Sequence, residues 1–329
     1  MELLKLLIFL KMHNVLIIGA GNIGALFDSS ESNHISSHAH AIKKSANFNL
    51  VGFVDNNEIN LEKASNLWST KGYKNIKSAF DDNKIDIVTI ASSSNSHYQI
   101  FKEISKFDLK LIFIEKPLAK KIEDCDDMIN ISIERKIPVL VNYSRRFISE
   151  FYEIKNQIKN NLFGKFINGT GYYGKGLVNN GTHMLDFLRF IFDKKIKKIA
   201  TFQKLNDFFE DDPSVSAKIL IEDCGEFNLN IIDSRNYSIF EMELFFEKAR
   251  IRFLNSFTKI EFHFIDDKKF LGDYKKLSIN KIIDINYDFS LLKAYENIDN
   301  YLSNKSSLLI CTINDGAEVL KTAINISNE

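Results

Sequence analysis

Five short apolar runs recur along the first 143 residues, and stretches with helical spacing separate them. The runs are NVLIIG (14–19), LVGFVD (50–55), IDIVTIA (85–91), LKLIFIE (109–115) and IPVLVNY (137–143). They are continuously apolar rather than alternating, which is typical of strands covered on both faces in a parallel sheet. The alternation of strand and helix predicts a doubly wound α/β domain.

Polar or glycine-rich residues follow each of these runs. Ligands bind at the carboxyl ends of the strands in an open parallel sheet, so we expect these residues to line a ligand crevice. The candidates are Gly19, Gly21, Asn22, Ile23, Gly24, Asp55, Ser92, Ser93, Glu115, Lys116 and Asn142.

The segment GAGNIG and Asp55 together predict a Rossmann-type dinucleotide site. The glycines allow a tight turn and let the backbone approach a pyrophosphate. Asp55 would bind the ribose hydroxyls and repel a 2′-phosphate, so NAD is expected rather than NADP. Asp55 lies 31 residues beyond Gly24, where about 20 is usual, and we interpret residues 27–40 as an insertion. A glycine turn without a ligand is the alternative.

Composition limits the other classes. A chain of 329 residues with 45% hydrophobic content is expected to form two domains. Its 43 basic and 43 acidic residues balance, which does not favour a nucleic-acid partner. The three cysteines are far apart and form no CxxC pair, which indicates a reducing, cytoplasmic location without disulfides. The apolar stretch at 1–10 is too short to span a bilayer.

The pattern changes after Tyr143. Residues 144–161 and 180–192 are predicted to be helical, and a glycine-dense stretch separates them. Alternating strands follow between 214 and 265, which predicts an antiparallel sheet with one covered face. The second face is expected to meet solvent or another subunit, and the Phe and Ile residues of 237–265 favour a subunit interface. Residues 289–303 and 312–327 are expected to be helices.

We therefore predict a dinucleotide-binding domain at 12–143 and a substrate-binding and oligomerisation domain at 144–329, with the last helices as candidates to pack on the first domain. The predicted fold class is α/β, a doubly wound parallel sheet joined to an α/β domain with a large, mostly antiparallel open sheet.

Five motifs, in this order and spacing, resemble the glucose–fructose oxidoreductase / inositol dehydrogenase / MocA family: GAGNIG, VGFVD, EKPLA, NYSRRF and NNGTHMLD. The resemblance covers nearly the whole chain, and EKPLA and the Gly-x-His-x-x-Asp element are its most specific parts. It implies an NAD(P)-binding Rossmann domain and an open sheet that commonly mediates assembly, hence a homodimer or homotetramer. It also implies oxidation or reduction of a hydroxyl or carbonyl on a sugar, cyclitol or nucleotide-linked sugar.

By position, the resemblance makes Lys116 the catalytic lysine, Glu115 a cofactor-contacting acid and His183 the catalytic histidine. Asn179 stands where many members have Asp, so the negative charge beside His183 is missing. YGKG followed by NNGTH resembles the bacterial surface-glycan and nucleotide-sugar branch.

His97 also matches the family. SSSNSH, residues 92–97, replaces the usual Thr-Pro-Asn-x-x-His, so His97 is kept as a cofactor-binding candidate while Ser93 and Ser94 replace the Pro and Asn.

Alcohol oxidation moves a hydride from carbon and a proton from oxygen. A lysine in a partly dry crevice, such as Lys116, can donate a hydrogen bond to the developing oxyanion. His183, with a reference pKa of about 6.5, suits general acid/base catalysis. Which of the two is the base stays open. The candidates for binding substrate hydroxyls or a phosphate are Arg146, Tyr173, Lys175, Asn180 and Asp186.

Simpler interpretations exist for several residues. In these interpretations, Lys116 is a solvated loop lysine and His183 caps a helix. Asp186 accepts a hydrogen bond from a backbone amide. His34, His38 and His40 are spaced like metal ligands, but no carboxylate or cysteine matches them, so no metal is expected; His38 remains a candidate near the cofactor. His263 lies on the polar phase of its strand and is expected to be exposed.

Two other functions stay open. The same fold can carry a non-catalytic NAD- or sugar-sensing regulator, because fold alone does not determine function. A reductase of a non-sugar ring substrate would use the same cofactor.

Overall fold

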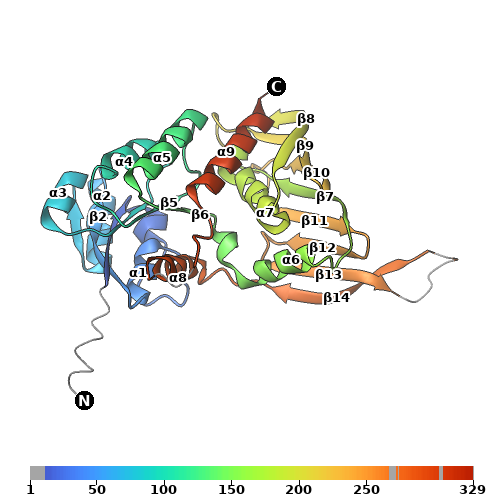
Figure 1. Ribbon diagram of the computed structural model, residues 1–329, viewed down its shortest axis with the longest axis horizontal. Helices are drawn as coiled ribbons and strands as arrows, with labels where there is room; N and C mark the ends of the chain where they lie inside the picture. The colour runs from blue at the N-terminus through green and yellow to red at the C-terminus, as the bar shows by residue number, and fades with distance from the viewer. Residues whose placement is uncertain (1–11, 267–271, 273, 304–306, 329) are drawn as a thin grey trace, which may run out of the picture. The chain divides into compact units, whose positions relative to one another are not determined.

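The computed structural model describes residues 12–266, 272, 274–303 and 307–328. The apolar stretch at 1–10 lies outside these residues. The fold divides into two compact units (Figure 1). Unit 1 contains the described residues up to Phe147 and Asp288–Ala317, and unit 2 contains Ile148–Tyr287 and the residues from Glu318 onward. Within the described ranges, no helix is long and apolar enough to cross a membrane.

Unit 1 contains a six-stranded sheet in the order β3-β2-β1-β4-β5-β6, and every neighbouring pair is parallel. The predicted doubly wound sheet is therefore confirmed, with β3 as a strand that the sequence did not predict. The strands are β1 (His13–Ile18), β2 (Phe48–Val54), β3 (Lys71–Tyr73), β4 (Ile87–Ile90), β5 (Leu111–Glu115) and β6 (Val139–Asn142).

Helices cover both faces of this sheet, with α4 and α5 on one side and α1 and α8 on the other (Figure 1). The helices of unit 1 are η1 (Asn22–Leu26), α1 (His38–Lys44), α2 (Glu58–Trp68), α3 (Ile76–Asp82), α4 (His97–Ile104), α5 (Ile122–Arg135), η2 (Ser144–Phe147) and α8 (Ser290–Leu302).

The insertion is shorter than the sequence suggested. The first helical segment, η1, is a single π-helical turn, and helical structure resumes at His38, so residues 38–40 belong to α1. Asp28 holds the intervening loop, because its Oδ2 accepts hydrogen bonds from Ser36 N at 2.5 Å and from the His40 ring at 2.9 Å.

Unit 2 contains an eight-stranded sheet in the order β14-β13-β12-β11-β7-β10-β9-β8. Only β7 and β10 pair in parallel, which confirms a mostly antiparallel sheet. The strands are β7 (Phe166–Tyr173), β8 (Ile196–Leu205), β9 (Ser214–Ile221), β10 (Gly225–Ile231), β11 (Glu241–Phe246), β12 (Ala249–Leu254), β13 (Lys259–Asp266) and β14 (Lys276–Asp284). Its helices are α6 (Ser149–Lys159), η3 (Leu177–Gly181) and α7 (Thr182–Phe192), and α9 (Ile313–Ser327) begins in unit 1 and ends in unit 2.

The two faces of this sheet differ in chemistry. On the face covered by α6 and α7, aromatic rings form the core, such as Phe187 and Phe253 with centroids 5.2 Å apart. On the other face, Arg252 bridges Glu243 at 2.9 Å and Glu261 at 3.0 Å. The apolar side chains of strands 237–265 therefore face mainly the core, and the expected subunit interface on the second face stays a prediction.

His263 lies on this charged face but is buried, because its ring packs within 3.3 Å of the Glu261 carboxylate. The expectation that it is exposed is wrong.

Candidate functional site

The glycine loop after β1 has the shape that a dinucleotide requires. Gly19 has φ +105°, and a Cβ there would lie 2.5 Å from the backbone of Ala91 and Ser92. A Cβ on Gly24 would lie 2.0 Å from the Gly19 carbonyl oxygen. A Cβ on Gly21, by contrast, would meet no atom of the chain within 4 Å. Two glycines thus permit tight packing, and the third leaves open space where a pyrophosphate could approach.

Asp55 follows β2 and joins it to the glycine loop. Its Oδ2 accepts a hydrogen bond from Ala20 N at 2.6 Å, and its Oδ1 accepts one from Asn57 N at 2.8 Å. The carboxylate borders a cavity of about 360 Å³ that Gly19, Lys74 and Ser92 also line. This volume is within the range of ligand pockets, so the residues fit the nucleotide end of NAD.

The loop after β4 carries Ser92, Ser93 and His97. Ser92 lines the cavity and Ser93 is exposed. His97 is buried at the start of α4, with Nε2 3.1 Å from the Ser92 carbonyl oxygen and Nδ1 3.0 Å from that of Pro117. Burial lowers the pKa of His97, which favours the neutral ring. His97 therefore ties two loops of the site together.

The end of β5 holds Glu115 and Lys116, followed by a cis bond to Pro117. Oε1 of buried Glu115 accepts hydrogen bonds from His38 Nε2 at 2.9 Å and from Asn142 Nδ2 at 2.6 Å. Burial alone would raise the pKa of Glu115, but the hydrogen bonds from His38 and Asn142 and the charge of Lys116 outweigh it, so the pKa is lowered. Glu115 is thus an ionised carboxylate beside Lys116.

Two predicted substrate ligands are committed to the protein interior. The buried guanidinium of Arg146 donates to the Ile310 carbonyl oxygen at 3.1 Å and lies 3.3 Å from the Asp315 carboxylate. The buried hydroxyl of Tyr173 donates to the Val215 carbonyl oxygen and accepts from the Val215 amide, both at 2.8 Å. These partners hold one guanidinium nitrogen of Arg146 and the hydroxyl of Tyr173 inside the protein, and the substrate-binding roles of both residues stay predictions.

In unit 2, the segment between β7 and α7 carries Lys175, Asn179 and Asn180. Lys175 has φ +63°, and its ammonium lies 5.6 Å above the ring of Phe208. The side-chain amides of both asparagines donate to loop carbonyls: Asn179 to Lys175 at 3.1 Å and Asn180 to Gly174 at 2.9 Å. The asparagines therefore help to shape the segment that presents Lys175.

Two buried carboxylates that the sequence analysis did not single out hold this segment. Asp207 Oδ2 accepts from Lys175 N at 2.8 Å, and Asp212 accepts from the amides of Val178 and Asn179 at 2.8 and 2.7 Å. Burial would raise the pKa of Asp207, but its hydrogen bonds lower it overall. Both aspartates lie in the acidic run NDFFEDDPS. From sequence alone this run resembles a solvated loop, because the amides that the two carboxylates bind lie more than 30 residues away.

His183 lies in the first turn of α7 and is partly exposed. Asp186 is buried one turn later, and residues three apart lie on the same helix face. The ring of His183 also packs edge-on against Phe240, with centroids 6.4 Å apart. The helix thus brings His183 and Asp186 to one side.

Two of the three histidines of the insertion are paired with carboxylates. His38 and His40 are fully buried, and each is paired with a carboxylate from elsewhere in unit 1. Across the described part of the chain, no group of three His, Cys, Asp or Glu side chains is arranged to hold a metal ion.

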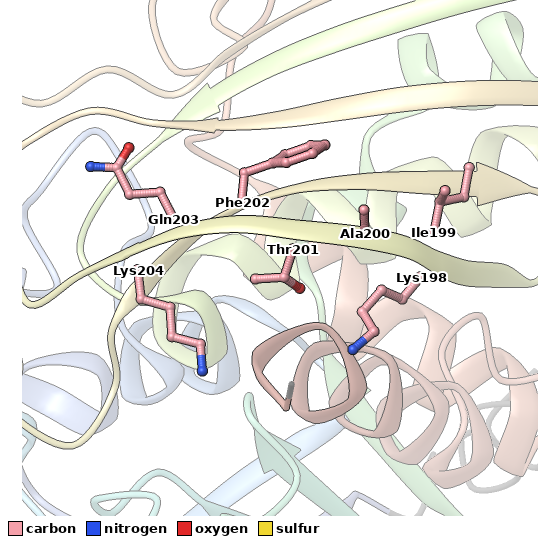
Figure 2. A pocket seen from close by; sticks show the side chains of 7 residues that line it. All are labelled: Lys198, Ile199, Ala200, Thr201, Phe202, Gln203 and Lys204. Atoms are coloured by element: carbon pink, nitrogen blue, oxygen red, sulfur yellow. The ribbon is translucent and has the colours of Figure 1, made fainter.

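A hollow of about 620 Å³ runs along the edge strand β8 of unit 2, lined by residues 198–204 (Figure 2). The side chains of Thr201 and Lys198 point toward the end of α9. Thr201 Oγ1 donates to the Ile326 carbonyl oxygen at 2.7 Å, and Lys198 Nζ donates to the Asn328 carbonyl oxygen at 2.5 Å. None of the predicted site residues lines this hollow.

Comparison with known proteins identifies the Rossmann unit. Residues 13–143 match the family model GFO_IDH_MocA, described as an oxidoreductase family with an NAD-binding Rossmann fold. The myo-inositol 2-dehydrogenase of Thermotoga maritima is 29% identical over 150 residues, which cover 45% of this chain and 41% of that protein. The match therefore spans less than half of the length of this curated relative.

Solved structures match nearly the whole fold. The WlbA dehydrogenase of Bordetella pertussis, in complex with NADH and UDP-GlcNAcA, has a TM-score of 0.74 at 16% identity and covers 96% of both chains. The UDP-N-acetylglucosamine 3-dehydrogenase GnnA of Acidithiobacillus ferrooxidans has a TM-score of 0.72 at 14% identity, over 95% of this chain and 96% of that one. The NAD prediction agrees with the description of the matching model, because residues 13–143 are similar to the NAD-binding Rossmann fold of the glucose–fructose oxidoreductase / inositol dehydrogenase / MocA oxidoreductase family.

Proposed function

We propose that the protein is an NAD-dependent oxidoreductase that transfers a hydride between nicotinamide and a hydroxyl or carbonyl carbon of a sugar. The observation that carries this proposal is the end of β5, where Lys116 follows an ionised, buried Glu115 on the same sheet edge as the open glycine turn.

Each unit contributes chemistry to this proposal. The glycine loop and Asp55 would hold the dinucleotide, which supplies the hydride acceptor or donor when bound. The ammonium of Lys116 would donate a hydrogen bond to the substrate oxygen and stabilise its developing negative charge. The imidazole of His183 would move the hydroxyl proton. Asn179 places no charge four residues before His183, unlike the Asp of many family members.

We further propose a nucleotide-linked sugar as the substrate, in surface-glycan biosynthesis. Two of the structural relatives are a UDP-sugar dehydrogenase and a dehydrogenase crystallised with a UDP-sugar. Lys175 and the exposed Phe208 beneath its ammonium offer a positive charge for a phosphate and an aromatic surface for a ring. A homodimer or homotetramer in the cytoplasm completes the proposal and rests on the family resemblance.

The direct test follows the absorbance of reduced nicotinamide while purified protein and NAD receive a panel of free sugars, cyclitols and UDP-sugars. We expect a UDP-sugar to give the fastest change. Lys116→Ala should abolish most of it. Lys110→Ala is the matched control, because Lys110 precedes β5 at the opposite end of the strand and pairs with Asp86 at 3.0 Å.

The outcome also separates an enzyme from a regulator. Turnover in the wild type and in Lys110→Ala, with a large loss in Lys116→Ala, supports the enzyme. NAD binding without turnover on any member of the panel, and identical behaviour of the Lys116→Ala variant, would instead indicate a sensor on the same fold.

A further inference from the structure

A buried chain of hydrogen bonds lies behind Glu115 in unit 1. The two nitrogens of His38 have different partners: Nε2 lies 2.9 Å from Glu115 Oε1, and Nδ1 lies 3.2 Å from the hydroxyl of Tyr295. The Tyr295 hydroxyl in turn lies 2.9 Å from the hydroxyl of Thr89. His38, Tyr295 and Thr89 are completely buried, so each polar atom depends on these partners.

The direction of these hydrogen bonds follows from the chemistry of the groups. An ionised carboxylate only accepts, so Nε2 of His38 must carry the hydrogen. Burial raises the pKa of Tyr295, so its hydroxyl stays protonated and can donate to Nδ1. Thr89 can then donate to the Tyr295 oxygen. One consistent arrangement thus runs from Thr89 through Tyr295 and His38 to Glu115.

Aromatic packing keeps the imidazole in place for this arrangement. The ring of His38 meets Phe113 edge-on, with centroids 5.0 Å apart, and Tyr295 at 5.9 Å. Phe113 lies on β5, two residues before Glu115. The strand that delivers Glu115 therefore also orients the ring that binds it.

We propose that His38 is a positioning residue that, backed by Tyr295, fixes the carboxylate of Glu115 beside Lys116. This inference rests on the proposed function for its catalytic meaning, because it assigns to His38 the task of keeping a negative charge next to the catalytic ammonium. His38 acts through Glu115 and is not itself assigned to the substrate.

Four titratable groups face Glu115, each from a different element or strand end. They are His38 from α1, Lys116 from the end of β5, His97 from α4 and Tyr295 from α8. His38 hydrogen-bonds the carboxylate directly, and the uncharged amide of Asn142 joins it there. Loss of His38 should therefore raise the pKa of Glu115, and the charge beside Lys116 would disappear at a higher pH than in the wild type.

The test uses carboxyl ¹³C NMR on protein labelled at glutamate, without cofactor or substrate, with the Glu115 signal assigned by its loss in Glu115→Gln. We expect His38→Phe, which keeps a ring of similar shape, to raise the titration midpoint of Glu115 by about one to two pH units. His38→Gln retains an N–H donor and should stay within about half a unit of the wild type.

His40→Gln is the matched control. His40 lies in the same helix, is equally buried, and binds Asp28 rather than Glu115. This variant should leave the midpoint of Glu115 unchanged. An unchanged midpoint in His38→Phe, or an equal shift in His40→Gln, would overturn the proposal.

A second measurement keeps the inference testable if His38→Phe does not fold. In ¹⁵N-histidine spectra of the wild type, we expect the Nε2 hydrogen of His38 to exchange slowly with water, and to exchange faster in Tyr295→Phe. Absence of a protected Nε2 hydrogen on His38 would contradict the arrangement.

With active enzyme, the acid limb of the kcat/KM profile should move to higher pH in His38→Phe by the same amount. If no sugar is turned over but the NMR results hold, the proposed function fails and the arrangement stands. If turnover occurs and the midpoint of Glu115 does not move, only the role of His38 fails.

Discussion

Two segments position the predicted catalytic residues, one at the end of β5 and one between β7 and α7, and each rests on buried carboxylates with different kinds of donors. In unit 1, Glu115 beside Lys116 is held by the side chains of His38 and Asn142. In unit 2, Asp207 and Asp212 hold the segment before His183 mainly through backbone amides. A side-chain donor can be removed by a single substitution, whereas a backbone amide cannot. We therefore expect the first segment to depend on the identity of its donors and the second to be a rigid mount.

The largest expected effect tests whether the rigid mount serves catalysis. His183→Asn should lower kcat by about 10²–10⁴-fold, because it removes a general acid/base group, while NAD affinity stays nearly unchanged. Steady-state kinetics and titration with NAD measure the two quantities. His34→Asn, in the exposed part of the insertion, is the control and should behave as the wild type. A kcat within threefold of the wild type in His183→Asn would remove the histidine from the mechanism.

The next effect concerns the mount itself. Asp212→Asn should lower the free energy of unfolding by about 1–3 kcal/mol, because the Val178 and Asn179 amides donate to different oxygens of Asp212 and Asn replaces one of these oxygens with an NH2 group, which leaves one amide unsatisfied. Urea unfolding measures the change. Asp211→Asn alters the exposed neighbouring carboxylate and should change stability by less than about 0.5 kcal/mol. Equal effects of the two substitutions would show that burial of Asp212 is unimportant.

The pH dependence of stability sharpens the comparison further. The pKa of Asp207 is lowered in the folded state, so its stabilising contribution is present above its ordinary unfolded value and is lost as the pH falls through the lower folded value. Asp207→Asn should therefore be less stable than the wild type at pH 7, by about 1–3 kcal/mol, and the difference should shrink in strong acid. Urea unfolding at several pH values would contradict this account if the difference were constant.

The smallest effect comes from Asp55, a carboxylate of unit 1 whose donors are backbone amides. Asp55 lies in the same unit as Glu115 but has the same kind of donor as Asp207 and Asp212, so its substitution shows whether the donor or the unit determines the behaviour of a carboxylate. Asp55→Asn should reduce the preference for NAD over NADP by about tenfold, because the repulsion of a 2′-phosphate is lost. It should leave the titration of Glu115 unchanged. Cofactor titrations that show no change in preference would exclude Asp55 from cofactor selection.

Local patterns predicted much of the fold. The buried strands of unit 1 are continuous apolar runs, and their order predicted the sheet. The sequence did not predict strand β7, because the glycines at positions 169 and 171 are typical of a loop. They are glycines for a tertiary reason, since a Cβ on Gly171 would lie 2.2 Å from the sulfur of Met184.

The site residues show the same limit. Lys116 and Glu115 were predicted from their place after a strand, and both stand at that strand end in unit 1. His38 and Asp207 act through partners 77 and 32 residues away, and no local pattern indicates such pairs. The sequence also does not show that polar atoms of Arg146 and Tyr173 have partners inside the protein, and their substrate-binding roles stay predictions. The expectation that Lys116 and His183 act on the same hydroxyl stays a prediction.

Transfer of the hydrogen itself is the most direct measurement. Reduced NAD carrying deuterium at nicotinamide C4 would be incubated with the protein and the keto form of each UDP-sugar, and the sugar product analysed by mass spectrometry. The account predicts one deuterium bound to carbon in the product of the wild type and of Lys110→Ala, and almost none with Lys116→Ala. Reduced NAD that binds to the protein, yet passes no deuterium to any UDP-sugar, free sugar or cyclitol ketone, would contradict it.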